Sequence, residues 1–270
     1  MNSPSVVVIT GASDGIGAEL ARQWALRERE RVVLVLAARS LDKLQQVAAD
    51  CRAAGAQATV LRCDVAEHAD CQSLITQAVQ AHGRLDTLVN NAGMSAHARF
   101  DEVSDLGWYE TLMRINLWGA VWCTHAALPH LKASRGRLVA VSSLAGLVGV
   151  PGRTAYSATK FAMTGFFEAL RTELAPQGVS VTIAYPGVVA TQIRHRGFDA
   201  QGRPAGKSGL DERGAMSVQT CAAMILDGTL ARRREVVMTT KGKLGRWIKL
   251  LAPGVVDRLA LKALNREAAR

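Results

Sequence analysis

The sequence offers little from which a metal site or a disulfide framework could be built. Its five cysteines are scattered without a Cys-x-x-Cys pair, and its six histidines include no His-Glu-x-x-His motif. We therefore expect no bound metal, and reduced thiols of the kind found in cytoplasmic proteins.

Long apolar runs and clustered aromatics are also missing. No apolar run reaches the ~18–20 residues that a membrane-spanning helix needs, and no basic, cleavable leader precedes the first apolar segment. The aromatic residues, 5% of the total, are not interleaved with the basic ones, which argues against a nucleic-acid groove despite the net charge of +10. We expect a cytoplasmic protein without a nucleic-acid partner.

The chain alternates short apolar segments with longer amphipathic ones. The apolar segments predict strands at 5–10, 31–38, 57–63, 86–89, 137–141, 179–184 and 235–239. Helical spacing predicts helices at 16–29, 41–54, 67–82, 108–132 and 155–175, and Pro129 is expected to kink or end the fourth. This alternation predicts an α/β, doubly wound, Rossmann-like fold with a seven-stranded parallel sheet and helices on both faces.

No linker divides the first 240 residues, so residues 1–240 are interpreted as one domain. Within it, the stretch at about 187–215 is long, polar and rich in glycine, which is typical of a functional flap or of a solvated loop. As a flap, its basic residues, Arg194 and Arg196 among them, would suit an acidic or phosphate-bearing substrate.

Residues 241–270 form a basic extension with apolar residues at helical spacing. The first apolar stripe consists of Leu244, Trp247, Ile248 and Leu251. After a break at residues 252–254, a second stripe includes Ala263, and the basic face beside it includes Arg266. The extension is predicted to be an amphipathic helix pair that lies on an anionic membrane surface, or that packs against the protein or a partner subunit.

The turn between the first strand and the first helix carries three glycines. In Thr10-Gly-Ala-Ser-Asp-Gly-Ile-Gly17, the glycines let the backbone turn tightly and approach a pyrophosphate at a helix N-terminus. The alternative is a glycine-rich turn without a ligand. Its position directly between strand and helix favours the nucleotide site.

The end of the second strand predicts which cofactor binds. It reads Ala-Ala-Arg39-Ser40 and lacks the carboxylate that would accept a hydrogen bond from the ribose of NAD. Arg39 suits the 2′-phosphate of NADP and Ser13 would add a hydroxyl, so we expect NADP(H) rather than NAD(H). Asp14 counts against this, because a carboxylate would repel the phosphate. Arg39 also has the alternative role of a solvated arginine at a helix start.

Tyr156 and Lys160 lie four residues apart in a predicted helix, and therefore on one face of it. A nearby cation favours the phenolate and lowers the pKa of a tyrosine from its ordinary value of ~10 toward the range useful for acid/base catalysis. Ser143 follows a predicted strand and would hold a carbonyl oxygen together with Tyr156, with Ser142 as its rival. Taken alone this spacing is weak, and the rest of the chain decides its meaning.

Together these motifs resemble those of the short-chain dehydrogenase/reductase family, in its NADP-preferring type. In the family's order and approximate spacing, the sequence carries the Thr10–Gly17 turn, Asp64, Asn90-Asn-Ala-Gly93, Asn116, Ser143, Tyr156-x-x-x-Lys160 and Pro186-Gly187 with Thr191. The resemblance covers about residues 5–191.

The resemblance implies a role for each of these positions. Besides Arg39, the cofactor would contact Gly11, Ser13, Gly15, Ile16, Gly17, Asp64, Val65, Asn90, Ala92, Gly93, Tyr156, Lys160, Pro186, Gly187, Val189 and Thr191. Tyr156 would exchange the proton, Lys160 would hold the nicotinamide ribose and Ser143 would polarise the carbonyl. Asn116 would anchor a water in the proton relay, whereas the residues alone favour an asparagine satisfied within its own helix. A homodimer or homotetramer paired through the helices at 108–132 and 155–175 is implied as well.

We expect an NADP(H)-dependent oxidoreductase that interconverts a carbonyl and a secondary alcohol on an apolar small molecule, with a tyrosine acid/base. The alternative is an NADP(H)-sensing binding protein of the same fold without turnover. The intact set of Asn116, Ser143, Tyr156 and Lys160 argues against that alternative. Some lipid- and steroid-handling members of the family are similar in the Ala-Arg-Ser after the second strand and in a basic C-terminal extension, which bears on the substrate class.

Overall fold

The centre of the molecule is a parallel sheet of seven strands in the order β3-β2-β1-β4-β5-β6-β7. The computed structural model describes residues 3–210 and 212–268, and side chains as far as residue 262. The strands are β1 (Ser5–Thr10), β2 (Val32–Ala38), β3 (Gln57–Arg62), β4 (Thr87–Asn90), β5 (Arg137–Val141), β6 (Ser180–Tyr185) and β7 (Glu235–Val237). The predicted doubly wound fold is confirmed, and every strand end lies within two residues of its predicted position.

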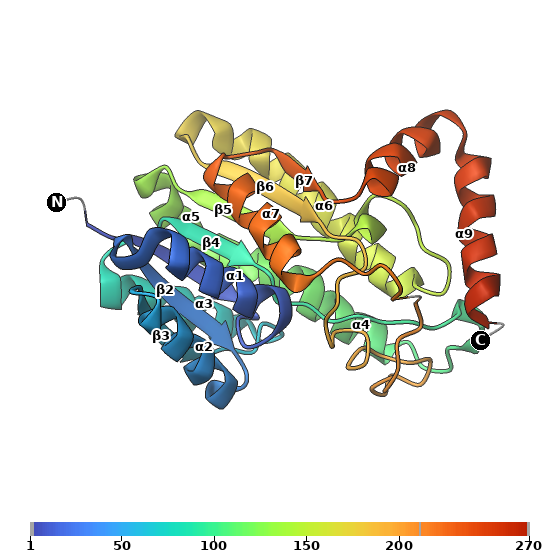
Figure 1. The fold of residues 1–270 in the computed structure, drawn as a ribbon, viewed down its shortest axis with the longest axis horizontal. Coiled ribbons are helices and arrows are strands. Elements are labelled where there is room, and N and C mark those ends of the chain that lie inside the picture. Colours follow the sequence, from blue (N-terminus) through green and yellow to red (C-terminus); the bar gives the residue numbers. More distant parts are fainter. Residues whose placement is uncertain (1–2, 211, 269–270) are drawn as a thin grey trace.

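Helices cover both faces of this sheet (Figure 1). One face packs against α1 (Gly15–Glu28), α2 (Leu41–Ala53) and α7 (Val218–Leu230). The other packs against α3 (His68–His82), α5 (Gly119–Ser134) and α6 (Thr154–Leu174). Because both faces are covered, the strands are apolar on both sides, as in β2, where every residue is buried.

The sequence did not predict α7. Its packing depends on Gly228, where an added Cβ would lie 2.3 Å from Cγ2 of Val236 in β7. A glycine near the end of an apolar stretch weakens a helix prediction, because glycine has a low helix propensity. Here the close approach of helix and strand requires it.

The helical region predicted at 108–132 is divided into three parts. α4 (Gly107–Met113) leads into a π-helical turn, η3 (Arg114–Trp118), and then into α5. Of the two outcomes expected at Pro129, a kink or an end, the end is wrong, because α5 continues through Pro129 to Ser134. Ala127 and Leu131 on either side of the proline are fully buried against the sheet, and this tertiary packing outweighs the lost backbone hydrogen bond.

The remaining short helices are 3-10 turns. They are η1 (Arg29–Arg31), η2 (Phe100–Glu102), η4 (Leu144–Gly146) and η5 (Ala175–Gln177).

The flap and the C-terminal helices lie at the carboxyl ends of the strands (Figure 1). The extension forms α8 (Thr240–Leu251) and α9 (Pro253–Ala268), with the break between them where the sequence placed it. Ala263 and Arg266 of the predicted second stripe lie outside the residues whose side chains are described. Among the described residues, no helix is both long enough and apolar enough to cross a membrane.

Candidate active site

The glycine-rich turn is held open by close packing of backbone segments. Gly11 has φ 65° and Gly15 φ 54°, a left-handed region that other residues rarely adopt. An added Cβ at Gly17 would lie 2.4 Å from the carbonyl oxygen of Gly11 and 2.4 Å from Nδ2 of Asn91. Gly17 therefore brings α1 against the turn, while the N-terminus of α1 faces the cavity above the sheet.

The segment after β4 is tied to this turn. Nδ2 of Asn91 donates to the carbonyl oxygen of Thr10 (2.9 Å) and to that of Gly11 (3.2 Å). Oγ1 of Thr10 accepts from the backbone N–H groups of Asn91 and Ala92, both at 3.0 Å. These bonds join β1 and β4 at the point where the strand order reverses, which is where ligands bind in such sheets.

A cavity of about 630 Å³ opens at this edge of the sheet. Of the residues predicted to form the site, it is lined by Gly11, Ser13, Gly15, Ile16, Arg39, Asp64, Val65, Ala92, Gly93, Ser143, Tyr156, Lys160, Pro186, Gly187, Val189 and Thr191. Three predicted residues, Gly17, Asn90 and Asn116, do not line it. Asn90 lies behind the wall, with Nδ2 donating to Oγ1 of Thr124 (2.9 Å).

Tyr156 and Lys160 both extend from α6 into the cavity and are largely buried, at 7% and 4% exposure. Nζ of Lys160 donates to the carbonyl oxygen of Val141 (3.0 Å) and lies 5.8 Å from the centroid of the Tyr156 ring. Burial raises the pKa of Tyr156, but the charges of Lys160 and Arg153 and an interaction with the Ser143 hydroxyl outweigh it and leave this pKa below 10. Burial also lowers the pKa of Lys160, while Tyr156 opposes that shift.

The two serines after β5 are used differently. Oγ of Ser142 is buried and donates to the carbonyl oxygen of Lys160 (3.3 Å), which holds β5 against α6. Ser143 caps η4, where its Oγ accepts from the N–H of Ala145 (3.2 Å). That bond leaves the hydroxyl hydrogen of Ser143 available for an oxygen in the cavity.

Asn116 lies in the π-helical turn η3 and is fully buried. Its Oδ1 accepts from the N–H of Met94 (2.7 Å), and its Nδ2 donates to the carbonyl oxygen of Met94 (2.9 Å) and to Oγ1 of Thr159 (3.0 Å). The side chain is thus satisfied, but by the segment after β4 and by α6 rather than within its own helix. It fixes the loop that carries Gly93 next to Lys160.

The end of the cavity beside β2 and α2 is basic. Arg39 lines it together with Lys43, one turn further along at the start of α2. Asp14, the residue that argued against a phosphate here, accepts from the N–H of Gly15 (2.6 Å) and forms an ion pair with Arg196 of the flap. Burial raises the pKa of Asp14, but these two contacts outweigh it and keep the carboxylate charged, with its charge balanced by Arg196.

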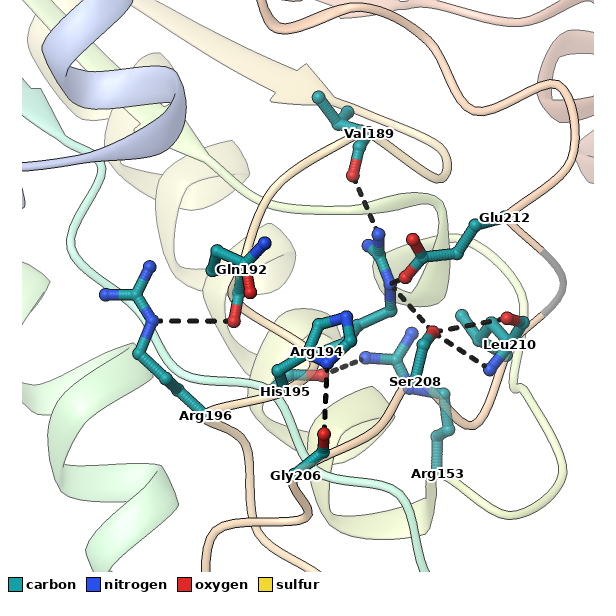
Figure 2. Close-up of polar contacts among 11 residues, drawn as sticks. Arg153, Val189, Gln192, Arg194, His195, Arg196, Gly206, Ser208, Leu210 and Glu212 are labelled. Carbon is teal, nitrogen blue, oxygen red and sulfur yellow. Dashed lines mark hydrogen bonds and ion pairs between the residues drawn. The ribbon is translucent and has the colours of Figure 1, made fainter.

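Polar and aromatic contacts tie the flap to the body, and Arg194 and Arg196 form bonds within the protein (Figure 2). Arg194 donates from Nε to Glu212 (2.7 Å) and from Nη2 to the carbonyl oxygen of Val189 (2.9 Å). Phe198 packs on Trp108, with ring centroids 5.6 Å apart. With Arg194 bound to Glu212 and Arg196 bound to Asp14, neither is a ready receptor for an acidic substrate.

Sequence reasoning missed several residues of the cavity wall, among them Lys43, Arg153 and Ala260. Lys43 had a usable signal, since it lies four residues after Arg39 at a helix start. Arg153 lies three residues before Tyr156, but nothing in the sequence shows that it turns inward. Ala260, in α9, is brought to the cavity only by the tertiary placement of the extension.

Comparison with known proteins agrees with this geometry. A family model described as "short chain dehydrogenase" matches residues 5–202. A protein of Arabidopsis thaliana named "11-beta-hydroxysteroid dehydrogenase-like 4A" is 44% identical over 185 residues, which are 68% of this chain and 60% of that protein. "11-beta-hydroxysteroid dehydrogenase A" of Sesamum indicum is 36% identical over 262 residues, covering 93% of this chain and 73% of that protein.

A solved structure is similar as well. The alcohol dehydrogenase from the archaeon Thermococcus sibiricus, complexed with 5-hydroxy-NADP, superposes with a TM-score of 0.74 at 25% identity, covering 87% of this chain and 94% of that one. The chain spans only 60% of the length of the Arabidopsis relative.

A doubly wound parallel sheet with a glycine-rich turn at its carboxyl edge is the dinucleotide-binding type of α/β fold. The chain belongs to the short-chain dehydrogenase family.

Proposed function

We propose that this protein is an NADP(H)-dependent oxidoreductase that interconverts a ketone and a secondary alcohol on an apolar, steroid-like small molecule. The observation that carries the proposal is that Tyr156, buried and with a lowered pKa, opens onto the same cavity as the glycine-rich turn. One cavity therefore joins a group suited to proton transfer with a turn suited to a dinucleotide.

The residues present fit a nicotinamide cofactor. An added Cβ at Gly93 would lie 3.2 Å from Oδ1 of Asn116 and 3.7 Å from Nζ of Lys160, so glycine keeps the space beside Lys160 free. Gly11 and Gly15, at the N-terminus of α1, would hold the pyrophosphate, and Lys160 the nicotinamide ribose. When bound, the cofactor supplies or accepts the hydride.

The protein's part of the reaction is to handle the proton and the charge. In reduction, Oη of Tyr156 gives its proton to the substrate oxygen, while the hydroxyl of Ser143 donates a hydrogen bond to that oxygen. Lys160, held by the carbonyl oxygen of Val141, favours the phenolate that remains. In oxidation the phenolate takes the proton from the alcohol.

The substrate end of the cavity supports an apolar substrate. Its wall contains Leu144, Val148, Val150, Pro151, Ile193, Leu210 and Ala260. The flap arginines beside this wall are bound to Glu212 and Asp14, so a charged substrate has no unoccupied cation among them. The names of the relatives favour a steroid-like alcohol or ketone within this class.

The test is Tyr156→Phe, with Tyr109→Phe as the control. Tyr109 bonds to Oγ1 of Thr154 (2.8 Å) away from the cavity wall. Oxidation of NADPH in the presence of steroid ketones should fall about 10²–10⁴-fold in the first variant and stay unchanged in the second. Unchanged turnover in Tyr156→Phe would show that the tyrosine mechanism is wrong.

The same assay separates the enzyme from a binding protein. A sensing protein would bind NADPH, detected by cofactor fluorescence, and show no turnover in the wild type with any steroid or smaller ketone. The enzyme turns over in the wild type, and Tyr156→Phe should still bind NADPH, because the substitution removes one hydroxyl and leaves the pyrophosphate turn intact.

We also propose that the C-terminal extension contacts anionic membrane surfaces from the cytoplasmic side. α8 is fixed to the body, since Nζ of Lys249 donates to the carbonyl oxygen of Leu147 (3.0 Å), yet Trp247 is 57% and Leu251 85% exposed. Co-sedimentation with phosphatidylserine vesicles should fall in the double variant Trp247→Ser, Leu251→Ser. Equal binding of the variant and the wild type would remove this proposal.

We propose further that the protein is a homodimer or homotetramer paired through α5 and α6. Trp118, at the start of this surface, is 47% exposed and stacks on Trp122 with ring centroids 6.0 Å apart. Aromatic side chains that reach the surface in this way are typical of interfaces. Light scattering coupled to gel filtration tests the proposal, and the mass of a monomer at micromolar concentration would overturn it.

A further inference from the structure

Arg153 is placed against the face of the Tyr156 ring. It is the N-cap residue of α6 and is 9% exposed. Its guanidinium carbon lies 4.0 Å from the centroid of the Tyr156 ring. This is closer than Nζ of Lys160, which lies 5.8 Å from the same centroid.

The guanidinium is held in this place by the segment after β4. Nη2 donates to Oγ of Ser95 (2.7 Å), and Nε donates to the carbonyl oxygen of Ala96 (3.2 Å). Two donors fixed to neighbouring acceptors set the plane of the group, because a guanidinium is rigid and flat. The ring of Tyr156 is therefore packed against a surface that does not move independently of the cavity wall.

A cation in this position acts differently on the two forms of the tyrosine. A phenolate ring carries more negative charge than a phenol ring, so a cation over the ring face stabilises the phenolate more. Because both groups are buried, water screens this interaction only weakly.

We propose, on the basis of the proposed function, that Arg153 is a positioning residue for Tyr156. Arg153 orients the Tyr156 ring toward the substrate, and its positive charge favours the phenolate together with that of Lys160. Arg153 lines the cavity as well, and it packs on Tyr156 and donates hydrogen bonds to the loop after β4. Its effect on the reaction passes through Tyr156.

Other charged groups also face this pair. Lys160 and Arg194 act on Tyr156 in the same direction as Arg153. His97 faces Arg153, and the pKa of His97 is lowered by burial and by the charge of Arg153. Arg194 is bound to Glu212, and it acts on Tyr156 less than Lys160 and Arg153 do.

The experiment compares Arg153→Met, Arg153→Lys and the control Arg171→Met. Arg171 lies on the same helix and donates from Nε to the carbonyl oxygen of Val181 (3.3 Å), away from the cavity. In alcohol oxidation, which requires the phenolate, kcat rises with pH. Its midpoint should move up by about one pH unit in Arg153→Met, move up less in Arg153→Lys, and stay in place in Arg171→Met.

A titration of tyrosinate absorbance tests the same point without turnover. The chain has three tyrosines, and subtraction of the Tyr156→Phe curve isolates the signal of Tyr156. Its midpoint should shift upward in Arg153→Met by the same amount as the midpoint of kcat. If the wild-type protein shows no turnover, the proposed function is refuted, but this titration can still be measured and still tests the role of Arg153.

The proposal is overturned if Arg153→Met lowers kcat equally at every pH, with both midpoints unchanged. That outcome would describe an arginine that only holds the loop after β4. It is also overturned if Arg153→Lys shifts the midpoints as far as Arg153→Met, because charge would then make no contribution.

Discussion

Arg39 and Lys43 are expected to make the protein bind NADPH more tightly than NADH. Both side chains are exposed at the end of the cavity beside β2 and α2. At an exposed site, the attraction between one cationic side chain and a phosphate in contact with it contributes about 1 kcal/mol to the free energy of binding. Replacement of Arg39 by alanine should therefore weaken NADPH about 5-fold, and replacement of both residues about 30-fold. The affinity for NADH, which lacks the 2′-phosphate, should not change.

The assay is fluorescence titration of both cofactors with wild type, Arg39→Ala, the double variant and the control Lys132→Ala. Lys132 is exposed on α5 and does not line the cavity. The difference between NADPH and NADH should also shrink as salt is added, because salt screens exposed charges. Equal affinity of wild type for the two cofactors, or an equal loss for both in Arg39→Ala, would refute the assignment.

Three further predictions concern the fold, the flap and the substrate. Gly17→Ala should lower the free energy of unfolding by about 3 kcal/mol, because its Cβ would overlap the turn. Gly165→Ala, at an exposed position of α6 where an added Cβ meets nothing within 4 Å, should raise it by about 1 kcal/mol, and denaturant unfolding measures both. The hydrogen bond from Arg194 lowers the pKa of Glu212 below 4.5. The carboxylate therefore stabilises the flap above pH 4.5, and this stabilisation is lost as the pH falls through the lowered pKa. Hydrogen exchange of the flap should show this loss in the wild type, and Glu212→Gln should abolish the pH dependence. Ala260→Trp should reduce kcat/KM for bulky ketones about tenfold or more and spare small ones, whereas Leu261→Trp, exposed and outside the cavity wall, should change neither.

The sheet could be predicted because its signals are local. Each strand is a short apolar run bounded by polar or glycine residues, and β2, buried along its whole length, is the plainest case. The helix α7 escaped prediction because Gly228 lowers local propensity and is explained only by the nearness of Val236. The end of the helix at Pro129 was wrongly predicted for the same reason. The neighbours of Pro129 are held by tertiary packing, which a local rule does not take into account.

The site divides in the same way. Residues in fixed-spacing motifs, such as Tyr156 and Lys160, were placed by the sequence in one cavity, and the structure brings them together there. The partners of Asn116 could not be predicted, since Met94 and Thr159 come from segments remote in the sequence. Likewise, no pattern shows that Arg196 would balance Asp14, 182 residues away.

The contribution of α9 to the cavity has a consequence for biosynthesis. The glycine-rich turn begins at Gly11 and Ala260 lines the same cavity, so the cavity draws on residues from 11 to 260 of the chain. A nascent chain emerging from the ribosome could complete the sheet through β7 before Ala260 has been released. Most of the cavity, including the wall residues from Leu144 to Leu210, would then be present before α9 is added, and Ala260 would complete the wall last.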